Sequence, residues 1–517
     1  MTISVHRSQW TWTPVLGWAL LACGLAATPA HAQLQQTPPD VSQPGGGTTS
    51  ESPDGTLGPS GGLLLPGAST TGATSTGSTA PDSTSAGSTT SNGIPLPVPP
   101  SAVQLLPSSG STIVGSPFGA GTAVPVEIST TNTSPELGIS TGSFTLYPQI
   151  ELNAGYDDNV FAQSAAYGTV GSFYSTVSPA LILRSNWLNH ELYLAASGTF
   201  GFYEAAPSQN YQNFNLGIGG KVDVQKDFYV TWSLGYNQST EPLGSPNAPT
   251  GSAPNVVDAI PINLGVYQRF NRFFYKLSLN ATRTYYYDGS PVTTGVLPGE
   301  SRDLTSYDES LQLGYELTDD LSIFVTPDIN QRRYLNPINA VGQQRNSDGQ
   351  GLSLGASWAI NGTSSINGSV GYTSQNYYDG LGTNNAFIFS LGGNWNGYEP
   401  LNLRPSITRT IQETPLSNYS SYVSTTYGVD FDWIVHDAWT MSGGLSLQTA
   451  AYDAVPGSGA VPRTDYFFRS RIGLLYTLRP QIQIGPFVEY SNGWSTDPIN
   501  GPSYEREIFS IRLIAKR

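Results

Sequence analysis

The sequence offers few of the side chains that catalysis or covalent cross-linking needs. It contains one cysteine and four histidines in 517 residues. Cys23 and two of the histidines lie in an N-terminal segment that we expect to be cleaved, so the exported chain has no disulfide, thiolate metal site or cysteine nucleophile. A Ser-His-Asp site or a histidine cluster would depend on His190 and His436, which fall at predicted turns. We therefore expect no enzyme, no bound metal and no cofactor.

Charge and long apolar runs are also scarce. Only 11% of the residues are charged, and the formal net charge is −15. A nucleic-acid binder would need a basic face, so nucleic acid is not an expected partner. Beyond the N-terminal segment, no apolar run reaches the length of about 18 residues that a membrane-spanning helix requires. If the chain crosses a membrane, it does so with strands.

Residues 1–32 have the features of an export signal. An apolar core over residues 15–27 precedes Ala30-His31-Ala32, whose small residues suit signal peptidase. We predict cleavage after Ala32. The alternative is a lipoprotein processing site, because Leu20-Leu21-Ala22-Cys23 would make Cys23 the lipidated first residue.

Residues 33–143 are low in sequence complexity. The stretch 69–91, for example, is rich in serine, threonine and glycine. Such a segment cannot bury enough apolar surface to offset the entropy of ordering, so we expect a disordered leader in the periplasm. Two apolar islands, 63–65 and 103–106, leave a second interpretation open. In that interpretation, part of the leader plugs the barrel or docks on a periplasmic export partner.

From residue 144 to residue 517, the chain reads as a series of strands. In the run 191–203, the apolar residues Leu192, Leu194, Phe200 and Phe202 alternate with polar or small ones. A period of two gives a strand one apolar and one polar face. Repeated without a helical stretch, this pattern predicts an all-β fold, a transmembrane antiparallel up-and-down β-barrel with lipid outside and a water-filled lumen inside. A soluble β-sandwich also alternates, but the export signal and the many consecutive hairpins favour the barrel.

The connections between these strands alternate between short and long. We count about 18 strands, with about 16 as the alternative. Short turns are predicted at 186–189, 226–227, 271–272, 318–320, 361–362, 396–397, 436–437 and 479–480, where the Asn-Gly pairs at 361 and 396 are direct hairpin signals. Longer polar segments are predicted near 157–171, 205–210, 242–256, 288–303, 335–349, 378–384, 413–421, 453–463 and 492–503. This asymmetry is typical of bacterial outer-membrane barrels, with the short turns and both termini in the periplasm.

Aromatic residues gather near the short turns, as expected of a girdle at the periplasmic membrane surface. They are Trp187, Phe228, Tyr229, Phe273, Trp395, Tyr398, Trp433 and Trp439. Two arginines, Arg283 and Arg409, fall on the apolar phase near the outer rim, where a charge costs about 0–1 kcal/mol rather than about 2–4 kcal/mol. Five prolines lie inside predicted strands, where each removes a hydrogen-bond donor from the ladder. They are Pro148, Pro179, Pro327, Pro405 and Pro486.

The polar phase of the strands predicts the lining of the lumen. Its candidate charged residues are Arg184, Glu191, Lys221, Asp223, Arg269, Glu316, Arg332, Arg404, Asp430, Asp432, Arg469, Arg471, Glu489, Arg506 and Arg512. Charges of both signs set the selectivity of a pore through local field and size. Because Arg469, Arg471, Arg506 and Arg512 lie on the last strands, we expect one basic wall. Aromatic residues on the same phase would suit sugar rings; they are Tyr193, Tyr203, Tyr229, Tyr267, Tyr286, Phe274 and Phe487.

At the end of the first strand, Tyr156-Asp157-Asp158-Asn159-Val160-Phe161 resembles a motif of the putative β-barrel porin 2 family of Gram-negative outer-membrane proteins. The next strand supports the likeness with 177–181 and 184–187. The resemblance covers residues 144–517 and implies an outer-membrane barrel. Some members accompany exopolysaccharide synthesis and export genes, which implies a route for polysaccharide. The chain departs from the usual aromatic C-terminal residue, since it ends in Lys516-Arg517.

We therefore predict a porin-like channel in the cell outer membrane that passes small hydrophilic solutes by diffusion. Its expected partners are outer-membrane lipid, the barrel-assembly machinery and, through the leader, periplasmic export partners. Two alternatives stay open. The first is a channel or accessory for exopolysaccharide export, and the second is a structural or adhesive surface barrel with a closed lumen.

Overall fold

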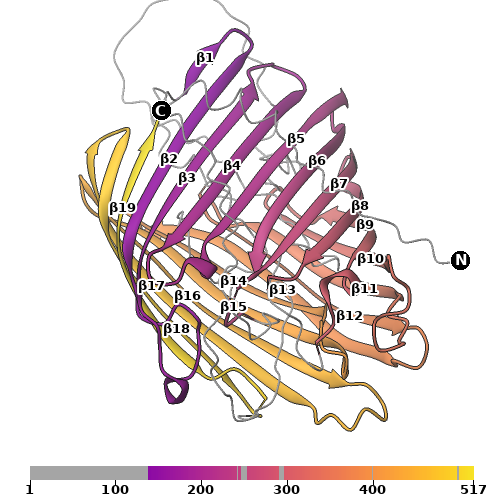
Figure 1. Ribbon diagram of the computed structural model, residues 1–517. Coiled ribbons are helices and arrows are strands. Elements are labelled where there is room, and N and C mark those ends of the chain that lie inside the picture. The colour runs from indigo at the N-terminus through magenta and orange to yellow at the C-terminus, as the bar shows by residue number, and fades with distance from the viewer. Residues whose placement is uncertain are drawn as a thin grey trace, which may run out of the picture. The chain divides into compact units, whose positions relative to one another are not determined.

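The structure, a computed structural model, describes residues 138–517 apart from 242, 246–252, 290–295, 362, 399 and 498–499. Within these residues, strands β2–β19 form one antiparallel sheet in which each strand pairs with the next in sequence. β19 also pairs with β2, which closes the sheet into a barrel of 18 strands (Figure 1). The all-β fold and the strand count are thus confirmed. The predicted signal peptide, its lipidation site and the leader up to residue 137 lie outside the described residues.

The strands are 13 to 18 residues long, sufficient for tilted strands to cross a bilayer. They are β2 (Phe144–Asp157), β3 (Ser172–Ser185), β4 (Glu191–Tyr203), β5 (Tyr211–Gln225), β6 (Phe228–Glu241), β7 (Asn255–Phe270), β8 (Phe273–Tyr287), β9 (Leu304–Glu316), β10 (Leu321–Tyr334), β11 (Ser347–Ala359), β12 (Ser365–Tyr377), β13 (Thr383–Tyr398), β14 (Leu401–Glu413), β15 (Tyr419–His436), β16 (Trp439–Ala454), β17 (Arg463–Arg479), β18 (Ile482–Ser495) and β19 (Tyr504–Lys516).

Short and long connections alternate, as predicted. Those of two to five residues lie at one end of the barrel, called the turn end here, and those of five to sixteen residues lie at the other, the loop end. Among the described residues of the loop-end connections, three single-turn 3₁₀ helices occur: η5 (Ala165–Tyr167), η6 (Pro207–Gln209) and η7 (Gly299–Ser301).

The turn predicted at Asn396-Gly397 is wrong, because β13 continues to Tyr398. The Asn-Gly pair instead falls at a register shift between Trp395 and Tyr398, where β13 bulges against β14. A Cβ at Gly397 would lie 2.7 Å from atoms of the Trp395 indole, so a larger residue there would have to displace that ring. The chain turns three residues later, at 399–400.

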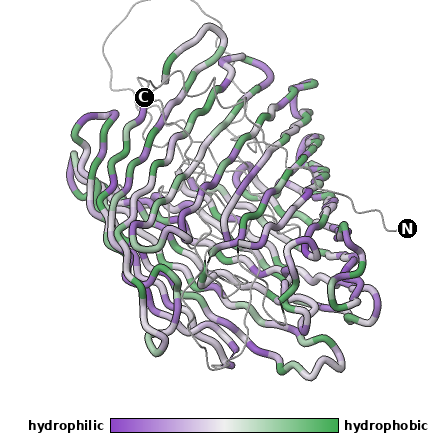
Figure 2. Tube along the Cα trace, viewed as in Figure 1, coloured by the Kyte–Doolittle hydropathy of each residue, from purple (hydrophilic) through white to green (hydrophobic). Residues whose placement is uncertain are grey.

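Residues alternate between the two faces of the barrel wall. In β4, Leu194 and Phe202 are exposed, whereas Tyr193 and Tyr203 are buried on the inner side. Figure 2 shows the same alternation of hydrophobic and hydrophilic residues along other strands. None of the helices in the described part of the chain is long and apolar enough to cross a membrane.

The five prolines do lie inside strands, and each stands where the ladder on one side of its strand is interrupted. Pro179 falls in a gap between β3 and β4, and Pro327 falls in a gap between β9 and β10. Pro148, Pro405 and Pro486 occupy similar gaps. Because the ladder is already interrupted at each proline, the missing amide donor does not break a continuous run of inter-strand hydrogen bonds.

Both described ends of the chain lie at the turn end (Figure 1). Lys516 near the C-terminus pairs with Gln149 near the start of β2. A short strand, β1 (Ile139–Thr141), pairs with residues 144–146 and continues the edge of β2 beyond the end of β19. Residues 139–141 were expected within the disordered leader, so the ordered chain begins slightly earlier than predicted.

β13 and β14 separate toward the loop end. Their ladder stops at Phe389 and Arg409, although β13 continues to Thr383 and β14 to Glu413. β14 stays fully paired with β15 up to Glu413, which stands opposite Ser421. We call residues 410–424 the β14–β15 tip. Its apolar residues Ile411 and Val423 pack on Ala386 and Ile388 of β13.

The β14–β15 tip lies over the inner face of the neighbouring strands. Arg332 of β10 donates to the carbonyl oxygen of Ile411 (3.3 Å), although four strand spacings separate β10 from β14. Along the wall this would be about 19 Å, far beyond the reach of an arginine side chain. Asn384 on the inner face of β13 likewise donates to Ser421 Oγ (2.7 Å). The tip therefore folds into the barrel and narrows its loop end.

Candidate functional site

The fifteen charged residues named above as candidates for the lumen lining all take part in ion pairs. The pairs are Arg184–Glu191, Lys221–Asp223, Arg269–Glu316, Arg332–Glu413, Arg404–Asp432, Arg469–Glu489, Arg471–Asp430, Arg506–Asp157 and Arg512–Glu151. Arg269 also pairs with Asp227 at 2.8 Å. Register places most partners on adjacent strands, so the lumen wall carries short charge pairs rather than rings of one sign.

The wall expected to be basic is therefore not uniformly basic. Arg469 and Arg471 do lie on β17, and Arg506 and Arg512 lie on β19. Each of the four faces a carboxylate on another strand. We predicted a basic wall from the arginines of the last strands alone. The closure of the barrel places the acidic residues of β2 beside β19, and these neutralise two of the arginines.

Two pairs at this closure are deeply buried. Arg506 donates from Nε to Asp157 Oδ1 (2.8 Å) and contacts the Tyr203 hydroxyl (3.4 Å). Arg512 Nε lies 2.9 Å from Glu151 Oε1, and its guanidinium stacks over the Phe487 ring at 3.9 Å. All four charged side chains are at most 2% exposed. Because removing one member of a buried pair leaves an uncompensated charge, these pairs secure the seam where the barrel closes.

The inward aromatic residues pack against one another. The rings of Tyr229 and Tyr267 are stacked at 4.8 Å, and Phe274 lies 6.0 Å from Tyr267. Tyr267, Phe274 and Phe324 form a buried cluster, in which Tyr229 also packs. Their faces are thus engaged with protein, and the arrangement gives no particular support to stacking on sugar rings.

The connection 414–418 is held from several sides of the barrel mouth. Val296, in the connection between β8 and β9, forms a β-bridge with Leu416, and Leu297 N donates to Pro415 O (2.8 Å). From the connection before β11, Arg345 donates to the carbonyl oxygens of Tyr419 (2.7 Å) and Ser420 (2.9 Å). Segments far apart in sequence therefore meet across the mouth.

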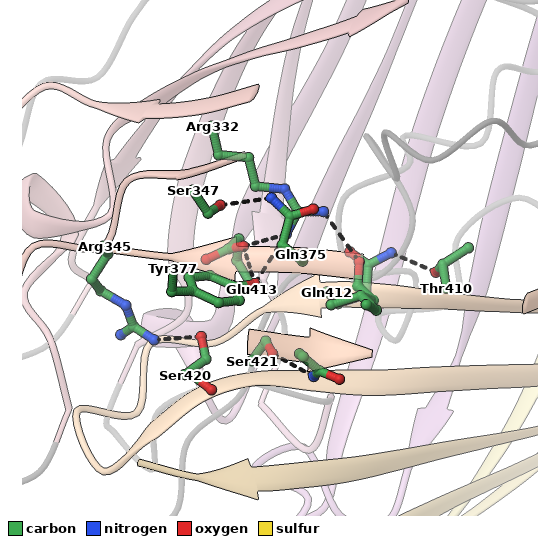
Figure 3. Close-up of polar contacts among 12 residues, drawn as sticks. Arg332, Arg345, Ser347, Gln375, Tyr377, Thr410, Gln412, Glu413, Ser420 and Ser421 are labelled. Atoms are coloured by element: carbon green, nitrogen blue, oxygen red, sulfur yellow. Dashed lines mark hydrogen bonds and ion pairs between the residues drawn. The ribbon is translucent and has the colours of Figure 1, made fainter. Parts of the chain in front are cut away.

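Glu413 is the polar centre of this contact (Figure 3). Its carboxylate pairs with Arg332 and accepts hydrogen bonds from the hydroxyls of Tyr334 (2.6 Å) and Tyr377 (2.8 Å). Arg332 and Tyr334 come from β10 and Tyr377 comes from β12, so one carboxylate joins the β14–β15 tip to two strands of the wall. We predicted Arg332 as a lumen residue but missed Glu413, which the sequence placed in a loop.

A second connection crosses the mouth from the other side. The Tyr504 hydroxyl on β19 donates to Gly244 O (2.7 Å), in the connection after β6. At the end of β6, Glu241 accepts a bidentate pair from Arg302 (2.8 and 3.1 Å), whose guanidinium also lies 4.0 Å from the Tyr286 ring. Although burial lowers the pKa of Arg302, the Glu241 carboxylate more than compensates and raises it above its usual value.

The histidines lie where the sequence predicted them, at the turn end. His190 N donates to Asp223 Oδ2 (2.9 Å), and Asp223 N donates to His190 Nδ1 (3.1 Å). His436 is exposed at the end of β15. Within the described residues, no three histidine, cysteine, aspartate or glutamate side chains gather into a metal-binding group.

Comparisons with known proteins agree with this architecture. The chain matches the family model described as "Putative beta-barrel porin 2" over residues 134–517. A comparison with curated proteins found no match. Among solved structures, the chain is similar to the copper transporter OprC, with 9% identity, coverage of 74% of this chain and 81% of that chain, and a TM-score of 0.42. It is also similar to OpdO of Pseudomonas aeruginosa, with 12% identity, coverage of 72% and 97%, and a TM-score of 0.38. These low values support no argument about what this chain transports.

Proposed function

Because the chain belongs to the putative beta-barrel porin 2 family, we propose that this outer-membrane barrel is a porin-like channel through which small hydrophilic solutes diffuse. The observation that carries the proposal is the inner face of the closed 18-stranded barrel, which is lined with polar residues and ion pairs. A barrel of this size is wide enough for an aqueous channel. The turn end then faces the periplasm, and the loop end faces outward.

The mouth contacts support selection by size. The β14–β15 tip reaches over the inner face of the wall, and Gly244 in the connection after β6 contacts Tyr504 of β19, so a solute would pass beside these residues at the loop end. Paired charges along the wall offer hydrogen-bonding groups to a polar solute without a strong field of one sign. We therefore propose passage of small solutes rather than of a folded protein.

Two rivals make different predictions for flux. The same contacts across the mouth favour a structural barrel with a closed lumen, because they would close the lumen if the β14–β15 tip stayed in place. Export of exopolysaccharide would need a wider path through the barrel and periplasmic partners docked on the leader, predicted at residues 33–143. We further propose that the barrel is not an enzyme, since His190 is engaged with Asp223 at the turn end.

Liposome swelling tests the proposal. The purified full chain is reconstituted into vesicles that are then diluted into isotonic solutions of neutral solutes of increasing size. A channel predicts swelling with monosaccharides and amino acids and none above a size limit. Vesicles that never swell, while the protein keeps the heat-modifiable gel mobility of an intact barrel, would favour the closed structural barrel.

A further inference from the structure

Two carboxylates and an amide lie together on the inner face of β9 and β10, beside the mouth contact. Asn330 of β10 stands directly opposite Asp308 of β9. Asp328 lies two residues from Asn330 on the same face, opposite Ser310. Side chains directly opposite have Cβ atoms about 4.5–5.5 Å apart, and diagonal neighbours lie about 7–8 Å apart. The three side chains therefore border one place on the lumen wall.

Each of these side chains has a buried oxygen without a hydrogen-bond partner. The atoms are Asp308 Oδ1, Asp328 Oδ2 and Asn330 Oδ1. Asn330 is only 3% exposed and Asp328 is 6% exposed. In the part of the chain that the structure describes, neither aspartate has a basic group within ion-pair distance. Burial of such oxygens is costly unless something supplies hydrogen bonds or positive charge.

Glycines on the next strand fix where these groups lie. Gly351 of β11 stands opposite Asp328, and a Cβ there would be 2.5 and 2.7 Å from the two carboxylate oxygens. A Cβ at Gly349 would lie against both Nδ2 and Oδ1 of the Asn330 amide and against Gln375 Oε1. The Asp328 carboxylate and the Asn330 amide thus lie over β11, on the other side of β10 from Asp308, at positions about 7 Å apart along the strand. A cation with part of its water shell matches that gap better than a bare ion does.

The nearest basic side chain on β10 is engaged with other partners. Arg332 is the next inward residue on β10 after Asn330, but its guanidinium binds Glu413 and the carbonyl oxygen of Ile411. Lys276 lies on β8, two strands from Asp328, opposite Gln312 of β9. Among the described residues, the site therefore presents oxygen acceptors with no basic group in an ion pair with them.

We propose that Asp308, Asp328 and Asn330 form a subsite for a hydrated divalent cation on the lumen wall below the mouth. The donors are all oxygens, which suit hard cations such as Ca²⁺. With few protein ligands, the affinity expected is that of weak extracellular sites, with a Kd of about 10⁻⁴–10⁻³ M. The consequence for permeation rests on the proposed channel function, whereas binding itself does not.

Binding is tested with Tb³⁺, a Ca²⁺ probe whose emission nearby tyrosine residues sensitise. The full chain in detergent is compared with the double variant D308N/D328N and with the control D348N. Asp348 is a control outside the subsite, because it lies on the outer face of the neighbouring strand β11 and pairs with Arg333. Wild type and D348N are expected to give Tb³⁺ emission that Ca²⁺ displaces, with affinity at least about tenfold weaker in the double variant. Equal affinity in all three proteins would overturn the proposal.

Permeation gives a second readout. In a KCl gradient across a planar bilayer, the ratio of K⁺ to Cl⁻ permeability should fall about 25-fold for each carboxylate removed, because a unit charge about 4 Å away in water favours K⁺ about fivefold and disfavours Cl⁻ about fivefold. If wild type binds Ca²⁺ but never conducts, the channel proposal fails and the subsite stands. If wild type conducts and D308N/D328N changes neither the permeability ratio nor the affinity, the subsite is refuted. D328N alone serves if the double variant loses the gel mobility of a folded barrel.

Discussion

Replacing Glu413 with glutamine should release the β14–β15 tip from the wall. The substitution removes the carboxylate that pairs with Arg332 and accepts from Tyr334 and Tyr377. The Arg332 side chain is 3% exposed, so it would be left as a buried charge without its partner. Removing one member of a buried pair costs about 3–5 kcal/mol, and the lower value applies here because glutamine keeps one acceptor. About 3 kcal/mol raises the population of the detached tip roughly 150-fold.

The matched control is Asp348→Asn. Asp348 pairs with Arg333, the residue next to Arg332, but that pair is 33% and 45% exposed. Exposed pairs contribute about 0–1 kcal/mol, so the control should change the detached population by at most about fivefold.

The assay is the labelling rate of a single cysteine at position 420, in a chain in which Cys23 is replaced by serine. Ser420 is 5% exposed, so a charged maleimide reaches residue 420 only when the tip detaches. When reclosing is fast, the labelling rate follows the detached population. We expect E413Q to label roughly 150-fold faster than the parent chain. Equal rates in E413Q and D348N would refute the role assigned to Glu413.

Three further predictions follow from the same contacts. Val296 and Leu416 are β-bridge partners, whose Cα atoms lie about 4.5–5.5 Å apart, so the variant V296C/L416C should form a disulfide. The disulfide should lower the conductance until it is reduced, and failure to cross-link would contradict the bridge. D157N should destabilise the barrel by about 3–5 kcal/mol, seen as a lower temperature of the heat-induced gel shift, whereas D223N, in a more exposed pair, should cost about 0–1 kcal/mol. R409A should speed hydrogen exchange around Phe389 relative to R283A, because Arg409 donates to Phe387 O (3.0 Å) and to Thr425 Oγ1 (2.8 Å) where β13 and β14 part; unchanged exchange would show that Arg409 does not hold β14 against β13.

The barrel could be predicted from the sequence because its signals are local. Alternation along strands such as 191–203 and the polar connections between them fixed the strand count and most turn positions. The Asn-Gly pair at 396 misled us, because the same dipeptide that favours a hairpin turn also fits a bulge inside a strand. Only the partner strand decides between these two structures.

The mouth could not be predicted, since it depends on contacts between distant segments. Ile411 and Val423 occupy the apolar phase, which for a barrel reads as lipid-facing, yet they pack on Ala386 and Ile388. In the sequence, Arg409 is a charge on the apolar phase. In the structure it donates a hydrogen bond to Phe387 O at the point where β13 and β14 separate. The lumen charges were found by phase, but their pairing required the register of neighbouring strands and the closure between β19 and β2.

The most direct test of the channel proposal is the single-channel conductance of the purified full chain in a planar bilayer. The proposal predicts discrete, stable conductance steps that persist when the protein is dilute. Silence from a protein that has inserted and keeps the heat-modifiable mobility of an intact barrel would contradict it and leave a closed structural barrel as the better explanation.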